Sequence, residues 1–162
     1  ILFFFKKLRL TITVYLFISF INFLNYNFNF ENFIKFNLLI TIIVSFDIFS
    51  YMFGKLLGKN KLIGWISPNK TIEGFAGGFV MSFLLAYIFM SLFNIDISIF
   101  ALFFIFIMII SSLIGDLLES YFKRKNNLKN SSSFLPGHGG FFDRFDSFLF
   151  SIIPFVYLSE FL

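Results

Sequence analysis

The chain of 162 residues contains no cysteine, one histidine, one tryptophan and three prolines. The missing cysteine excludes disulfide bonds, zinc centres built on thiolates and thiol nucleophiles. Charge is also scarce, because Lys, Arg, Asp and Glu together make up 14% of the residues, compared with about a quarter in soluble globular domains.

Hydrophobic residues are correspondingly abundant, at 58% of the chain, and the mean hydropathy is +0.87. A soluble domain of this length has too little interior to bury so much apolar surface. The composition therefore predicts an integral membrane protein of the all-α class, with residues 1–162 forming a single membrane-embedded domain.

Five apolar segments predict membrane helices, because a transmembrane helix needs about 20 mostly apolar residues. These segments are 8–24, 33–53, 75–93, 97–115 and 147–162. The third and fourth contain no charged residue, whereas the second carries Lys35 and Asp47 and the short fifth contains Pro154. The sequence thus predicts a polytopic bundle of about four or five transmembrane helices.

Twelve of the 13 basic residues fall into three groups. They precede the first segment, separate the second from the third, and separate the fourth from the fifth. With five spans all three groups lie on one side of the membrane, and this excess of Lys and Arg predicts the cytoplasmic side. Orientation of the protein would by itself account for these residues.

Acidic residues gather toward the same side, and orientation does not account for them. Six of the nine are Asp47, Glu73, Asp116, Glu119, Asp143 and Asp146. A carboxylate inside the membrane costs a few kcal/mol or more unless it is paired or faces water. Asp47, about 10 Å inside the second segment, therefore favours a functional role. The alternative is a packing carboxylate satisfied by a neighbouring hydroxyl or lysine.

The fourth segment ends in GDLLESYFKR, residues 115–124. Asp116, Glu119, Ser120 and Lys123 share one helical face at this spacing. The simpler interpretation is a solvated helix end, with an Asp116–Ser120 contact and a Glu119–Lys123 ion pair.

Residues 135–147, LPGHGGFFDRFDS, contain the only histidine. Gly139 and Gly140 allow the backbone to approach a ligand closely, and Asp143 and Asp146 are three residues apart. A helix cap would explain one of these acids, and His138 alone is also consistent with a turn residue.

Residues 67–74, SPNKTIEG, lie between the second and third segments. Ser67 and Pro68 predict a turn, and Lys70 and Thr71 offer a cation and a hydroxyl to a phosphate. The glycines that follow, in a GxxxG spacing, are equally consistent with close helix packing.

Carboxylates from different helices, surrounded by Lys, Arg and His, predict a magnesium site that binds phosphates. Mg²⁺ prefers oxygen ligands and usually binds through one or two carboxylates and the substrate phosphates. Such a site suits phosphoryl or nucleotidyl transfer. The sequence contains no P-loop pattern and offers no serine nucleophile for the histidine.

Residues 120–146, SYFKRKNNLKNSSSFLPGHGGFFDRFD, resemble the signature of the phosphatidate cytidylyltransferase family, also called CDP-diacylglycerol synthases. The family pattern is Ser, two residues, Lys-Arg, four residues, Lys-Asp, a proline-type turn, His-Gly-Gly, two residues and Asp-Arg-x-Asp. The segments SPNKTIEG, GDLLES and DIFSYMFGKLLGK also resemble the family in order. The residues in register are Ser120, Lys123, Arg124, Lys129, Pro136, His138, Gly139, Gly140, Asp143, Arg144 and Asp146.

The resemblance implies transfer of cytidylyl from CTP to phosphatidate at the cytoplasmic face of a bacterial inner membrane. It implies Mg²⁺, with room for a second cation, a homodimer in the lipid bilayer, and no nucleic acid partner. The implied catalytic residues are Asp116, Asp143, Asp146, Lys123, His138 and Arg144, of which Asp116 and Asp143 bind the metal. The implied substrate-binding residues are Asp47, Ser67, Lys70, Thr71, Ser120, Arg124, Lys129, Gly139 and Gly140.

The chain departs from the family pattern in two ways. Asn130 stands where the family has aspartate, which keeps the shape and loses the charge. Family members also carry several more N-terminal spans, which we expect to be missing here. Two alternatives stay open: another membrane phosphotransferase or nucleotidyltransferase, such as a polyprenol kinase, and a degenerate membrane protein without catalytic activity.

Overall fold

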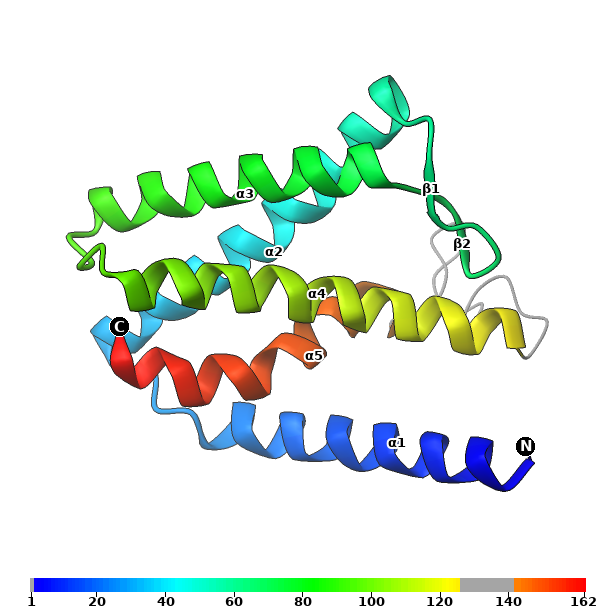
Figure 1. Cartoon of the computed structure of the whole chain (residues 1–162). Helices are drawn as coiled ribbons and strands as arrows, with labels where there is room; N and C mark the ends of the chain where they lie inside the picture. Colours follow the sequence, from blue (N-terminus) through cyan, green and yellow to red (C-terminus); the bar gives the residue numbers. More distant parts are fainter. Residues whose placement is uncertain (1, 126–141) are drawn as a thin grey trace.

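The computed structural model describes the backbone of residues 2–125 and 142–162, and the side chains of residues 10–125 and 146–162. Helices dominate the described chain, and one short hairpin joins two of them (Figure 1). The elements are α1 (Leu2–Asn25), α2 (Phe30–Leu57), β1 (Lys61–Ile63), β2 (Ser67–Thr71), α3 (Ile72–Leu92), α4 (Ile99–Lys125), α5 (Phe142–Leu158) and the 3-10 helix η1 (Ser159–Phe161).

Three of these helices are long and apolar enough to cross a membrane, namely α2, α3 and α4. The shortest, α3, has 21 residues and would extend about 30 Å, the thickness of the hydrocarbon core. Large apolar side chains are exposed along all three, including Val44, Val80 and Phe103, as expected for helices that face lipid. The described part of α1 forms a shorter apolar helix, and α5 has 17 residues with Pro154 inside it. The predicted all-α polytopic membrane fold is confirmed.

The described segments that carry the three basic groups lie at one end of the bundle. Figure 1 places the N-terminus, the β1–β2 hairpin and the C-terminal end of α4 at that end. The C-terminus of the chain lies at the other end. This arrangement agrees with the predicted alternation of the spans.

Small residues bring α2 and α3 into close contact. A Cβ atom added to Gly74 would lie 2.6 Å from the carbonyl oxygen of Ser50, and one added to Gly78 would lie 2.8 Å from the Ser50 Cβ. The GxxxG interpretation therefore holds for these glycines, because any side chain would force the helices apart.

The pair α4 and α5 is equally close at the end that carries the acids. A Cβ atom on Gly115 would lie 2.8 Å from the carbonyl oxygen of Asp146 and 2.9 Å from the Phe150 Cβ. Helix α1 packs against the outside of α5, where the Tyr15 hydroxyl donates to the Phe150 carbonyl at 2.7 Å. The contact at Gly115 brings the next residue, Asp116, to the start of α5.

The β1–β2 hairpin is absent from the sequence-based prediction, and the turn expected at Ser67 and Pro68 is wrong. Both residues belong to β2, which pairs antiparallel with β1 in the register Lys61↔Thr71 and Ile63↔Ser67. Proline is compatible with this position because a two-stranded sheet consists only of edge strands. The hairpin is the element that carries the cytoplasmic-loop motif toward α4.

Candidate functional site

Three carboxylates converge where α4 meets α5. Oxygen atoms of Asp116, Glu119 and Asp146 all lie within 4.8 Å of one another. Asp116 and Glu119 come from successive turns of α4, and Asp146 comes from the second turn of α5. We call these three residues the acidic cluster. The close approach of the two helices at Gly115 brings these residues together, although they are far apart in the sequence.

Lysines from two different elements balance part of this negative charge. Lys70 of β2 forms an ion pair with Asp116, and the Lys123 Nζ lies 2.6 Å from the Glu119 Oε2. The Asp146 carboxylate accepts a hydrogen bond from the Ser147 backbone N–H at 2.7 Å. Glu119 and Asp146 are only 8% and 6% exposed, so their burial requires compensating partners. Among the side chains that the structure describes, three carboxylates gather around two lysines, and such a set of oxygen atoms suits a cation.

The spacing of the acidic cluster also suits a divalent cation. Oxygen ligands around Mg²⁺ at about 2.1 Å lie roughly 3 to 4.2 Å apart. The oxygens of the cluster, within 4.8 Å of one another, are close to that spacing, and side-chain rotation would bring them into it. The donor set is made of carboxylates alone, which are the ligands that Mg²⁺ prefers.

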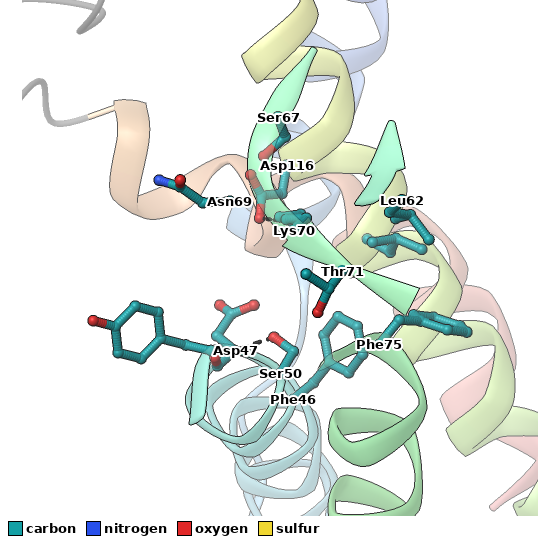
Figure 2. A pocket seen from close by; sticks show the side chains of 12 residues that line it. Phe46, Asp47, Ser50, Leu62, Ser67, Asn69, Lys70, Thr71, Phe75 and Asp116 are labelled. Carbon is teal, nitrogen blue, oxygen red and sulfur yellow. Dashed lines mark hydrogen bonds and ion pairs between the residues drawn. The ribbon is translucent and has the colours of Figure 1, made fainter. Parts of the chain in front are cut away.

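A cavity of about 260 Å³ opens beside Asp116 (Figure 2). Figure 2 shows Asp47 and Ser50 of α2 across this space from the Lys70–Asp116 ion pair, with Thr71 beside Lys70 on β2. Apolar side chains close the remaining walls. The lining residues are Phe46, Asp47, Ser50 and Tyr51 of α2, Leu62, Ser67, Asn69, Lys70 and Thr71 of the hairpin, Phe75 of α3, and Leu113 and Asp116 of α4.

Five of the predicted site residues therefore meet at one cavity although they come from three parts of the chain. They are Asp47, Ser67, Lys70, Thr71 and Asp116. Asp47 lies farther from the end of its helix than expected, because α2 continues to Leu57. Ten residues of helix after Asp47 correspond to about 15 Å.

The role of Thr71 is partly structural. Its hydroxyl oxygen accepts a hydrogen bond from the Gly74 N–H at 3.0 Å and caps α3. The hydroxyl hydrogen remains available to a phosphate, since a hydroxyl group both donates and accepts.

At the end of α4 the predicted residues take different places. The Glu119–Lys123 ion pair is confirmed, whereas Asp116 pairs with Lys70 instead of contacting Ser120. Arg124 is exposed, and its Nε donates to the Ile66 carbonyl at 3.3 Å, so it contacts the hairpin.

The remaining predicted residues lie partly or wholly outside the described part of the structure. Asp143 and Arg144 lie in the first turn of α5, with side chains outside the described part. The metal assignment to Asp116 and Asp143 stays a prediction. Outside the described residues altogether are Lys129, His138, Gly139 and Gly140.

Two acids have roles that the sequence did not assign. Glu119 belongs to the acidic cluster, and its signal was the three-residue spacing from Asp116. Glu73, in the first turn of α3, accepts hydrogen bonds from the backbone N–H groups of Lys59 and Asn60. No spacing rule predicts that contact, because it depends on the β1–β2 hairpin, which the sequence did not predict.

Comparison with known proteins agrees with this site. A family model described as the Cytidylyltransferase family matches residues 3–162. The chain is 49% identical over 117 residues to the phosphatidate cytidylyltransferase of Bacillus subtilis, which covers 72% of this chain and 43% of the relative. It is 47% identical over 111 residues to that of Staphylococcus saprophyticus and 48% identical over 110 residues to that of Staphylococcus aureus strain COL. Each alignment covers 67% of this chain and 42% of the relative.

The chain thus spans a little over two fifths of the length of these relatives. Residues 3–162, which match the family model, include the helices and the hairpin that form the acidic cluster and the cavity. The chain belongs to the cytidylyltransferase family.

Proposed function

We propose that the protein transfers the cytidylyl group of CTP to phosphatidate and forms CDP-diacylglycerol and pyrophosphate. The observation that carries this proposal is the convergence of the acidic cluster, Lys70 and Lys123 beside a cavity at one end of a membrane bundle. A lipid phosphate lies at the membrane surface and CTP is dissolved in water. A site for both must therefore lie at the end of the helices.

The reaction exchanges one phosphorus–oxygen bond for another. An oxygen of the phosphatidate phosphate attacks the α-phosphorus of CTP and forms the new bond. The bond from the α-phosphorus to the oxygen that bridges to the β-phosphorus breaks, and pyrophosphate leaves with the electron pair. Catalysis of such a step depends mainly on positioning and on stabilising negative charge.

Lys70 is placed to exchange partners during this reaction. Without substrate its ammonium group pairs with Asp116 at the edge of the cavity. A triphosphate in the cavity would offer Lys70 a stronger set of acceptors and would release the Asp116 carboxylate. Lys123 remains next to Glu119 and adds a second positive charge on the α4 side.

The acidic cluster is the place for Mg²⁺. Asp116, with the predicted ligand Asp143 and the neighbouring Glu119 and Asp146, would hold the ion. When bound, Mg²⁺ supplies positive charge that stabilises the phosphates in the transition state. The several carboxylate oxygens of the cluster would also accommodate a second cation.

The cytoplasmic face of a bacterial inner membrane is the proposed location. The basic segments at one end of the bundle favour that orientation, and the named relatives are bacterial. We further propose a homodimer, following the family resemblance. Residues 1–162 would form the membrane-embedded catalytic domain.

The test is an assay of membranes from cells that produce the protein. Incubation with labelled CTP and phosphatidate should yield labelled CDP-diacylglycerol and pyrophosphate in equal amounts. A labelled product that forms only with a polyprenol acceptor would identify a lipid kinase instead. No product from any lipid and nucleotide pair would support the degenerate alternative.

A further inference from the structure

Glu73 connects the two ends of the hairpin. Its carboxylate accepts hydrogen bonds from the backbone N–H of Lys59 at 3.1 Å and of Asn60 at 3.2 Å, and from the Asn60 Nδ2 at 2.8 Å. A backbone hydrogen bond from Ile72 N–H to the Asn60 carbonyl, at 2.9 Å, runs alongside. The residues directly before β1 are thereby joined to the first residues of α3.

This pattern differs from an ordinary acid at a helix N-terminus. Such an acid caps its own helix or interacts with the helix dipole. In α3 the cap is already supplied by Thr71, whose hydroxyl accepts from the Gly74 N–H. Besides a bond from its own backbone N–H, Glu73 accepts bonds from residues 13 and 14 positions earlier. These long-range bonds act on the hairpin.

At the base of the hairpin, Gly58 is exposed but packs closely on one side against α2 and Thr71. A Cβ atom on Gly58 would lie 2.2 Å from the Gly54 carbonyl oxygen and 2.7 Å from the Thr71 Cγ2. Residues 59 and 60 can therefore take few positions once Glu73 has bound them. The far end of the hairpin is held separately, where Trp65 meets Tyr121 edge to face at a centroid distance of 5.7 Å.

Between these two attachments lie the hairpin residues that line the cavity. Lys70 and Thr71 stand three and two residues before Glu73, respectively, and both line the cavity. In the free protein the ion pair with Asp116 also holds Lys70. Under the proposed function that ion pair opens when the nucleotide binds, and the hairpin then depends on its remaining attachments.

We propose that Glu73 is a positioning residue for nucleotide binding. Its carboxylate fixes the hairpin so that Lys70 and Thr71 keep facing the triphosphate after Asp116 has turned to the cation. This inference rests on the proposed function. It extends that function by assigning a residue that contacts the backbone of the hairpin and acts through Lys70 and Thr71. Preorganised groups of this kind act chiefly on substrate affinity and orientation.

The bonds to Glu73 lie at the surface, so their loss should not unfold the bundle. Net contributions of exposed hydrogen bonds to stability are small, and local opening of a hairpin does not require global unfolding. The structure also offers a matched control, because Glu31 occupies the second position of α2 as Glu73 does in α3. Figure 1 places the start of α2 at the end of the bundle opposite the hairpin.

The experiment compares Glu73→Ala, Glu73→Gln and Glu31→Ala with the natural protein in detergent micelles. Backbone hydrogen exchange of residues 59–71 should accelerate at least about tenfold in Glu73→Ala, with the same thermal midpoint. The KM for CTP should rise about tenfold with little change in the KM for phosphatidate. Glu73→Gln, whose amide oxygen can still accept, should restore most of the affinity, and Glu31→Ala should change none of these values.

Unchanged exchange in Glu73→Ala would overturn the inference, whatever the activity of the protein. Faster exchange with an unchanged KM for CTP would overturn it as well, because the hairpin would then not govern binding. Absence of cytidylyl transfer by the natural protein would refute the proposed function instead. These failures are distinguishable because hydrogen exchange needs no turnover.

Discussion

The contact at Gly115 makes a prediction about the geometry of the acidic cluster. In Gly115→Ala the new methyl group would start 2.8 Å from the Asp146 carbonyl oxygen and 2.9 Å from the Phe150 Cβ. Ordinary contacts of a Cβ atom begin near 3.4 Å. The two helices must therefore separate by about half an ångström or more at this level, next to Asp116 and Asp146.

That displacement is large for a catalytic site and small for a helix bundle. Metal and reacting groups need positions held within about 0.5 Å, and a misplacement of 1 Å can cost about a hundredfold in rate. Overpacking should cost the fold about 1 to 3 kcal/mol. We expect Gly115→Ala to lower the rate of CDP-diacylglycerol formation roughly tenfold to a hundredfold and to raise the Mg²⁺ concentration for half-maximal rate.

The matched control is Gly78→Ala. Its Cβ would lie 2.8 Å from the Ser50 Cβ. It therefore overpacks α2 against α3 to a similar degree, at a wall of the cavity but not in the α4–α5 contact that sets the acidic cluster. It should lower the thermal midpoint as much as Gly115→Ala but leave the Mg²⁺ dependence unchanged. The assay is initial rate against Mg²⁺ concentration at saturating CTP and phosphatidate. A Gly115→Ala protein with the Mg²⁺ dependence of the natural protein would refute the argument.

Further substitutions separate the parts of the site. Asp116→Ala and Asp143→Ala should each abolish turnover at unchanged protein level, and substantial residual turnover in either would contradict the metal assignment. Chelation with EDTA should stop the reaction and added Mg²⁺ should restore it, whereas a rate that persists in EDTA would exclude a divalent cation. Lys70→Met should raise the KM for CTP more than about tenfold, and Lys55→Met, an exposed lysine at the end of α2, should leave it unchanged. Asn130→Asp should increase the initial rate by restoring the family's charge, and a decrease would show that the amide is the better residue in this chain.

The membrane helices could be predicted because few backbone conformations satisfy all hydrogen bonds in a lipid bilayer. Backbone groups in hydrocarbon must satisfy one another, so a long apolar segment becomes a helix. The three strongest segments correspond to α2, α3 and α4 within one turn at their starts. The polar end of α4 extends the last of these to Lys125, because a helix continues into water where apolar periodicity no longer marks it.

The hairpin could not be predicted in the same way. β1 has three residues and β2 has five, too few to show an alternation of polar and apolar side chains. Ser67 and Pro68 resemble turn residues in any sequence. Their place in a strand depends on contacts made elsewhere, including the bonds from Glu73 to Lys59 and Asn60.

The sequence predicted which residues belong to the site but not which of them contact one another. Asp116 and Glu119 share a helical face, which spacing alone shows. The Lys70–Asp116 ion pair joins residues 46 positions apart, and the approach of Asp146 depends on the missing side chain of Gly115. Tertiary contacts of this kind leave no periodic signal in a sequence.

The glycine contacts divide the bundle into two stiff units, α2 with α3 and α4 with α5. At Gly74 and Gly78 the first unit has no room for a larger side chain, and at Gly115 the second unit has none. The cavity draws one wall from each unit. The width of the cavity consequently depends on the contacts between the two units. These include the Lys70–Asp116 and Arg124–Ile66 contacts, which connect the hairpin to α4. Substitutions at the contacts between the hairpin and α4 would change the width of the cavity, whereas substitutions at the glycines would disrupt the packing of the helices that form its walls.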